Sequence, residues 1–221
     1  MGASIWTVFI ENYPVFLNGL LGTLKYAFIA VFFGSILGAL IAMLHLSKNR
    51  ILSDIASIYV EVLRGTPLLV QMYIAYFFIP IAIPALSFMS KEQCVILSLI
   101  LNSSAYVSEI IRGGIQSVDS GQTEAARSLG MSSKNCMMKI VLPQAVKNIL
   151  PSLGNEYIAM IKETSLAGTF ALYELMFTRT ILANQFYTYQ PLFIVAAIYL
   201  LCTLVLSKLV KTMERRLAVS D

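Results

Sequence analysis

The chain alternates long apolar segments with short segments that hold most of its charged residues. About 20 helical residues, at 1.5 Å each, cross the ~30 Å apolar layer of a bilayer, so each segment is a candidate membrane span. Three candidates are free of charged residues, namely 26–44, 65–90 and 191–207. Two others, 93–111 and 151–172, carry charges that have to face away from lipid. The pattern therefore predicts an all-α integral membrane protein with about five transmembrane helices.

The basic residues between these segments predict the orientation, because Lys and Arg gather in cytoplasmic loops. The loops on one side hold only Lys91 and Arg179. The other side is much more basic and holds Lys48, Arg50, Arg112, Arg127, Lys134, Lys139, Lys147, Lys208, Lys211, Arg215 and Arg216. We therefore expect the N-terminus outside, the C-terminus inside, and the loop between the third and fourth helices in the cytoplasm.

The composition fits a membrane protein, with 57% hydrophobic and 13% charged residues against about 25% charged in soluble domains. A formal net charge of +4 then reports topology and does not indicate nucleic acid binding. The three cysteines are widely separated, and the single histidine, His45, has no carboxylate or cysteine near it in sequence. We expect no metal site, with His45 a boundary residue, and a single transmembrane domain over 1–221 with a core at about 19–212.

Small residues recur every four positions in the first span, at Ala30, Gly34, Gly38 and Ala42. Such a stripe lets another helix backbone approach closely, which is a main source of helix association in lipid. The partner helix is either within the same subunit, which we favour, or in a second copy.

The segment 119–143 is a polar island with readable helix signals. Asp119 followed by Gln122 resembles a capping box that begins a helix. Gly130 suits a left-handed C-terminal cap, Ser132 or Ser133 can begin a second helix, and Pro143 is expected to end it. The second helix carries an apolar set that can pack against a partner groove: Met137, Met138, Ile140, Val141 and Leu142. The alternative is a linker whose apolar residues lie on the membrane surface.

The same segment resembles the EAA motif of ABC-importer permeases. Glu124-Ala125-Ala126 is followed after three residues by Gly130, and after nine more by Ile140, one residue, then Leu142 and Pro143. Residues 61–71, 102–109 and 154–165 extend the similarity to the polar amino acid uptake (histidine/glutamine/arginine/opine) subfamily of type I importers. The resemblance implies that residues 119–143 form coupling helices in a groove of an ATPase subunit. The residues it assigns to coupling are Glu124, Ala125, Ala126, Gly130, Ile140, Leu142 and Pro143.

The chain lacks a G-x-x-x-x-G-K-[ST] loop for ATP phosphates, so its energy must come from a partner. The resemblance implies a dimer of ATPase subunits that holds ATP and Mg, a second permease copy and an extracytoplasmic solute-binding protein. A homodimer is favoured over a heterodimer with a related permease. The chain itself would then be a non-enzymatic, multi-pass transport subunit of a bacterial cytoplasmic membrane, with no cofactor of its own.

Polar residues deep in the bilayer are the candidates for substrate binding. Along ideal helices Arg64 lies about 21 Å from Arg50, Glu163 about 18 Å from Pro151, and Asn102 about 16 Å from Lys91. Pro67 follows Arg64 and breaks the helix, and a broken helix inside a membrane is tolerated where it lines a cavity.

The charges of these residues match an amino acid zwitterion. Arg64, with the Thr66 hydroxyl, could bind a carboxylate. Glu163 could bind an ammonium or a basic side chain, and Asn102 could assist either. In the alternative interpretation Arg64 pairs permanently with Glu61 or Glu163 and serves structure alone. Glu109 and Arg112, three residues apart, are most simply a helix ion pair.

Two other classes of protein could account for buried charges in a membrane. A membrane enzyme needs a nucleophile–base pair or a metal set, and the chain has neither H-E-x-x-H nor G-x-S-x-G. An ion-coupled secondary carrier or channel could use the same buried charges and broken helix. It would not need the gapped pattern between Glu124 and Pro143. The sequence thus favours the permease subunit of an ATP-driven importer of polar amino acids, basic ones included, that works by alternating access.

Overall fold

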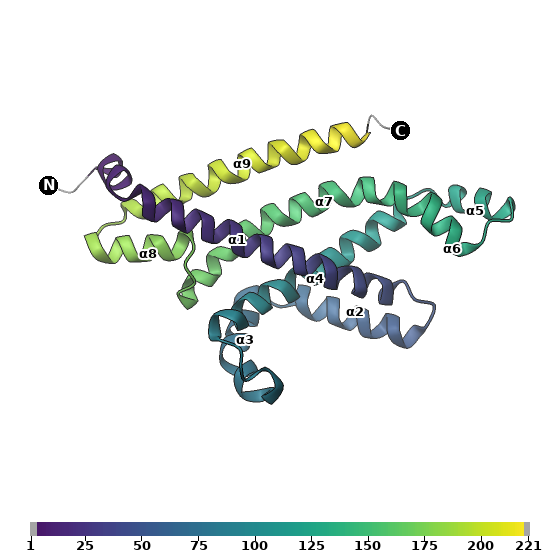
Figure 1. The fold of residues 1–221 in the computed structure, drawn as a ribbon, viewed down its shortest axis with the longest axis horizontal. Helices are drawn as coiled ribbons and strands as arrows, with labels where there is room; N and C mark the ends of the chain where they lie inside the picture. The colour runs from purple at the N-terminus through teal and green to yellow at the C-terminus, as the bar shows by residue number, and fades with distance from the viewer. Residues whose placement is uncertain (1–3, 219–221) are drawn as a thin grey trace.

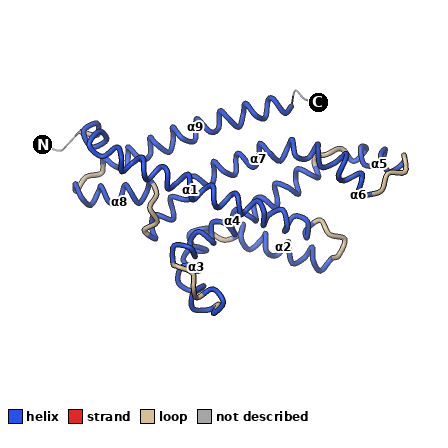
Figure 2. Tube along the Cα trace, in the orientation of Figure 1, coloured by secondary structure: helices blue, strands red, loops and turns tan. Residues whose placement is uncertain are grey.

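The computed structural model describes residues 4–218, and all regular structure within that range is helical (Figure 2). The elements in chain order are α1 (Ile5–His45), α2 (Arg50–Gly65), α3 (Leu68–Ala82), η1 (Pro84–Leu86), α4 (Lys91–Gln116), α5 (Ser120–Ser128), α6 (Ser133–Cys136), a π-helical turn η2 (Met137–Val141), α7 (Leu142–Glu163), η3 (Thr164–Phe170), α8 (Leu175–Phe186) and α9 (Gln190–Ala218). The expected all-α class is confirmed.

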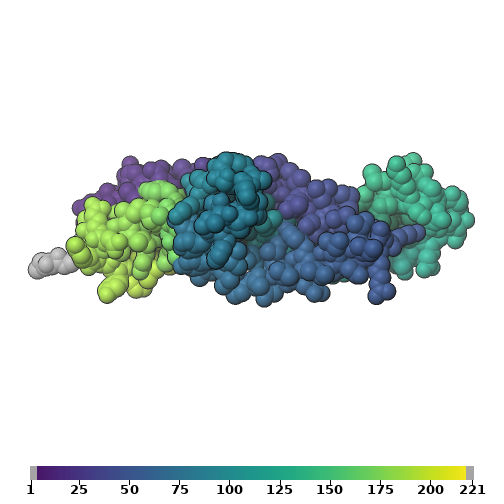
Figure 3. Space-filling view, turned by 90° about the horizontal axis from the view of Figure 1, so that it is seen from below, coloured from purple at the N-terminus to yellow at the C-terminus, as the bar shows by residue number. Residues whose placement is uncertain are grey.

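The molecule is elongated, and α1, α4, α7 and α9 run along its length (Figure 1). One end carries the α1–α2 loop, the end of α9 and the segment α5–α6, while the opposite end carries α8 and the start of α1. Figure 3 shows the α5–α6 segment projecting beyond the rest of the molecule. The predicted orientation of these two ends in a membrane stays a prediction.

Three helices of the described range, α1, α4 and α9, are long and apolar enough to span a membrane, and α2 and α3 together make a fourth candidate. The predicted count of five therefore stays a prediction. The remaining segment, 151–172, does not form one helix, because α7 begins at Leu142 and ends at Glu163, before η3. The first span is also much longer than 26–44, since α1 has 41 residues and is kinked at Asn12, two residues before Pro14.

The predicted helix break at Pro67 is present, and α2 and α3 meet there at 104°. Pro67 has no N–H, so the carbonyl of Leu63, four residues earlier, loses its helical partner. The Gln71 amide replaces that partner: its Nε2 donates to the Leu63 carbonyl at 2.7 Å, the Thr66 carbonyl at 3.1 Å and Thr66 Oγ1 at 2.9 Å. The carbonyl groups that the bend leaves without a helical donor are therefore hydrogen-bonded by a side chain of α3.

The apolar segment 65–90 proves to be a short helix followed by a turn. Helix α3 ends at Ala82, and Ile83 is extended with φ −120° and ψ 92°. A residue that precedes proline avoids the helical region, and Pro84 follows Ile83. The candidate span 65–90 is therefore divided between α3 and the turn after it, and its crossing of a membrane stays a prediction.

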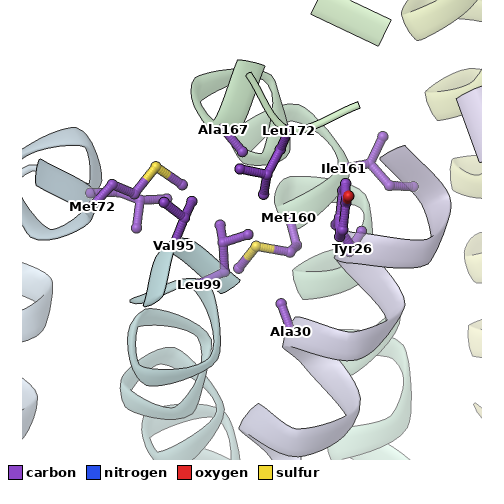
Figure 4. Packing of buried hydrophobic residues seen from close by; sticks show 11 residues of the cluster. Tyr26, Ala30, Met72, Val95, Leu99, Met160, Ile161, Ala167 and Leu172 are labelled. Atoms are coloured by element: carbon purple, nitrogen blue, oxygen red, sulfur yellow. The ribbon is translucent and has the colours of Figure 1, made fainter. Parts of the chain in front are cut away.

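The main core lies where α1, α3, α4 and α7 meet. Met72, Val95, Leu99 and Met160 point toward one another there, with Tyr26 and Ala30 beside them (Figure 4). The small-residue stripe of α1 is buried, and it faces α4 of the same subunit. A Cβ atom on Gly38 would lie 2.7 Å from the carbonyl oxygen of Ser104. This distance is too short for a real contact, so any larger residue would force the two helices to shift. The expected packing within the subunit is therefore confirmed.

Candidate functional site

The four residues predicted to bind substrate, Arg64, Thr66, Asn102 and Glu163, line one cavity. The cavity has a volume of about 460 Å³ and lies at the α2–α3 break, with α4 and α7 as its other walls. The residues are thus brought together from three parts of the chain, while their role in binding stays a prediction.

Arg64 supplies the cation of this cavity. Its side chain is 43% exposed, and its guanidinium carbon lies 5.3 Å from the centre of the Tyr106 ring. Its Nη1 donates to Glu109 Oε2 at 3.3 Å. In the alternative interpretation of the sequence, Glu61 or Glu163 is the partner of Arg64 in a permanent ion pair. The partner in the structure is Glu109.

Glu109 forms the helix ion pair with Arg112 that the spacing predicted, and it also contacts residues of two other helices. Arg112 does bind both carboxylate oxygens, Nε to Oε1 and Nη2 to Oε2, each at 2.8 Å. The same carboxylate also receives Arg64 from α2, and its Oε1 lies 3.8 Å from Nδ1 of His45, at the end of α1. His45 does lie at a helix boundary, as expected, but it contacts both this cluster and Ser57, whose Oγ is 3.1 Å from Nε2. Three helices therefore meet at Glu109.

Two carboxylates of α7 face the cavity. Glu163, in the last turn of α7, is exposed, whereas Glu156, seven residues earlier, is buried. Ser103 Oγ donates to Glu156 Oε1 at 2.9 Å. Glu156 was not among the predicted site residues, although a spacing of seven residues, two helical turns, is the signal that places both carboxylates on one face.

The amide of Asn102 is nearly buried and already engaged. Its Nδ2 donates to Gln71 Oε1 at 3.2 Å and to the Leu63 carbonyl at 3.4 Å, so it ties α4 to the helix break. Thr66 Oγ1 donates to the Val62 carbonyl at 2.8 Å. Cation, carboxylates, amide and hydroxyl groups thus share one cavity, which is the set of groups that a zwitterion requires. Among residues 4–218 there is no cluster of His, Cys, Asp or Glu suited to a metal ion.

The second candidate site is the α5–α6 segment, which folds around its own small core. Ala126, Cys136 and Val141 are buried there, and Met131 and Ile140 pack against them. Asp119 caps α5 as expected, but by accepting from the Gly121 amide at 2.8 Å, so the capping box with Gln122 does not form.

Gly130 ends α5 with φ +83°, which confirms the expected left-handed cap. The Gly130 amide donates to the Arg127 carbonyl at 3.0 Å and the Met131 amide to the Ala126 carbonyl at 3.1 Å. These two bonds are the Schellman pattern.

Pro143 does not end the second helix. From Ser133 to Glu163 the chain is helical throughout, with η2 between α6 and α7. The Leu142 amide donates to the Met137 carbonyl, five residues back, in the wider π turn. Such a turn accommodates a proline that lacks its own N–H. The expectation of two short helices before α7 is therefore replaced by one short helix and one continuous rod.

The motif residues divide into inward and outward positions. Ala126 is buried and Ile140 half-buried, while Glu124, Ala125 and Pro143 are exposed. Leu129, at the turn, is 89% exposed and Met138 is 58% exposed. Sequence reasoning missed Leu129 because a leucine before a glycine cap is normally expected to pack inward.

The fold and these two sites define a class of protein: a helical membrane transport component with a polar cavity among its helices and a projecting helical segment at one end. Residues 30–219 match the family described as binding-protein-dependent transport system inner membrane component, and the chain belongs to that family. It is thus a component of an ABC transporter.

The chain is similar to amino acid permeases along nearly its whole length. It is 43% identical over 206 residues to the putative glutamine transport system permease protein GlnP of Rickettsia bellii, covering 92% of this chain and 93% of that protein. It is 46% identical over 217 residues to the nopaline transport system permease protein NocM of Agrobacterium fabrum, covering 93% and 88%. A crystal structure of an amino acid ABC transporter with histidines has 42% identity, a TM-score of 0.91, and coverage of 98% and 100%.

Proposed function

We propose that this chain is the permease subunit of an ATP-driven importer that moves polar amino acids into the cytoplasm by alternating access. The observation that carries the proposal is the single cavity lined by Arg64, Thr66, Asn102 and Glu163. Similar proteins are named for glutamine and nopaline transport, and a similar structure contains histidines, so polar amino acids are the substrate class.

Within this proposal the Arg64 guanidinium binds the substrate carboxylate, and Glu163 binds its ammonium group. The Thr66 hydroxyl assists Arg64 by turning its proton from the Val62 carbonyl to the substrate carboxylate. Charged pairs of this kind form the strongest hydrogen bonds available to a zwitterion. Asn102 acts mainly by holding the helix break in place, through Gln71 and the Leu63 carbonyl. Glu156 supplies a second acidic wall, which suits basic as well as neutral amino acids.

The α5–α6 segment is the proposed docking point for an ATPase subunit, which binds ATP and Mg. The buried side chain of Ala126 and the left-handed cap at Gly130 favour a rigid shape for this segment. Exposed apolar side chains for contact with a partner are supplied by Ala125, Leu129 and Met138. The complex would contain two permease subunits, two ATPase subunits and an extracytoplasmic binding protein, in a bacterial cytoplasmic membrane. A homodimer is favoured because Arg64 and Glu163 come from one copy and can form a complete site within it.

Uptake into proteoliposomes tests this function. The permease is reconstituted with its ATPase and binding protein, ATP is enclosed on the ATPase side, and radiolabelled glutamine, histidine and arginine are offered. We expect ATP-dependent uptake of at least one of them, lost in Glu163→Gln and kept in Glu61→Gln, an exposed glutamate outside the cavity. Uptake driven by an ion gradient without ATP would instead establish the secondary carrier, and normal uptake by an assembled Glu163→Gln complex would remove Glu163 from the site.

A further inference from the structure

The cation of the cavity is not free in this structure, because Glu109 already binds it. Arg64 lines the cavity of about 460 Å³. Glu109 lines a second cavity of about 320 Å³ nearer the α5–α6 end, with Gly113, Ser117, Asn148 and Ser152. The Arg64–Glu109 contact therefore crosses from one cavity to the other.

The three bonds to the Glu109 carboxylate are unequal. Arg112 binds it with two bonds of 2.8 Å from the same helix, whereas Arg64 makes a single contact of 3.3 Å from another helix. Paired, short bonds between a guanidinium and a carboxylate are the stronger kind. Glu109 thus keeps its main partner if Arg64 leaves, so the release of Arg64 leaves no buried carboxylate without a counter-charge.

The cavity gives the Arg64 side chain room to move away from Glu109. This side chain is 43% exposed, lines the cavity and lies near the Tyr106 ring. A guanidinium above an aromatic ring is stabilised while it moves between two anionic partners. A substrate carboxylate in the cavity is therefore the natural second partner.

We propose that Glu109 is a positioning residue that holds Arg64 while the cavity is empty and that the substrate carboxylate displaces it. The inference rests on the proposed function, because it names how the same cavity selects its ligand. Two anions compete for one guanidinium, so Glu109 lowers the affinity for every ligand that has an α-carboxylate. A ligand without that carboxylate does not compete and does not release Arg64.

The test measures binding to the purified permease–ATPase complex without the binding protein. The probes are radiolabelled glutamine, histidine and arginine, with the unlabelled α-amide of each as competitor. An exposed ion pair contributes little, so removing it in Glu109→Gln should tighten binding of the acid about two- to fivefold. The affinity for the α-amide should not rise. Glu109→Asp, which keeps the charge near Arg112 but shortens the reach to Arg64, should act in the same direction and serves if Glu109→Gln does not assemble.

Glu61→Gln is the matched control, because Glu61 lies on α2 one turn before Arg64 and lines neither cavity. It removes the same charge without touching Arg64, so it should leave both affinities unchanged. Equal changes for acid and amide, a gain in Glu61→Gln as well, or weaker binding of the acid in Glu109→Gln would each overturn the inference. If the wild-type complex binds none of the three amino acids, the proposed function fails, and this inference with it.

Discussion

Replacing Gly130 by alanine isolates the role of backbone geometry in the α5–α6 segment. Gly130 has φ +83°, and an added Cβ atom would meet nothing within 4 Å. The substitution therefore creates no clash, and its whole cost is the left-handed backbone, about 1–2 kcal/mol for a residue with a side chain. At 1.4 kcal/mol per tenfold, the opening equilibrium of the cap should rise about 5- to 30-fold.

Amide hydrogen exchange measures this opening directly. The Gly130 and Met131 amides donate to the Arg127 and Ala126 carbonyls, so their exchange should accelerate by that factor in Gly130→Ala. Gly130→Asn should accelerate it less, because asparagine tolerates the left-handed region better than alanine does.

Gly113→Ala is the control for this measurement. Gly113 also has open space around its Cβ position but lies inside α4, where alanine is favoured over glycine by about 0.5–1 kcal/mol. Its variant should leave exchange at the cap unchanged. Equal acceleration by Gly130→Ala and Gly130→Asn would refute the assignment of the cost to the left-handed backbone, as would the same effect from Gly113→Ala.

Three further substitutions probe other contacts. Gly38→Val places a side chain against the Ser104 carbonyl, so thermal unfolding of the purified chain should show destabilisation of about 1–3 kcal/mol. An unchanged melting temperature would contradict the close α1–α4 approach. Gln71→Leu leaves the Leu63 and Thr66 carbonyls without that donor and should cost about 1–3 kcal/mol in the same assay; no loss would mean that water replaces the amide. Leu129→Asp should abolish co-purification of the ATPase subunit, whereas Tyr189→Asp should not, because Tyr189 is 80% exposed but lies in the loop between α8 and α9. Retained co-purification in Leu129→Asp would move the docking site away from the turn.

Local signals predicted the features that depend on neighbours in sequence. The break after Arg64 follows from Pro67, the cap of α5 from Gly130, and the α1–α4 contact from the spacing of small residues, because each is fixed within one or two helical turns. The continuous rod from α6 into α7 was missed, since a proline near a helix start normally marks a boundary and the π turn that absorbs it has no sequence signal.

Long-range partners could not be read in the same way. Arg64 and Glu109 are 45 positions apart, and only the packing of α2 against α4 brings them to 3.3 Å. Sequence separation likewise hid the contact of His45 with the same carboxylate. Gln71 was quoted as part of a motif, but its role as the substitute donor for the broken helix depends on the 104° bend, which composition does not encode.

The order of elements explains how the two sites are linked. The α5–α6 segment lies between the two helices that form walls of the cavity: α4 carries Asn102 and Tyr106, and α7 carries Glu163. Residues 117–119 alone separate α4 from α5, and α6 passes into α7 without a break in helical structure. A partner that displaces the projecting segment therefore pulls on both walls at once. Because Glu109 sits on α4 between cavity and segment, the residue that we propose to hold Arg64 lies on the path by which such a displacement would reach the substrate.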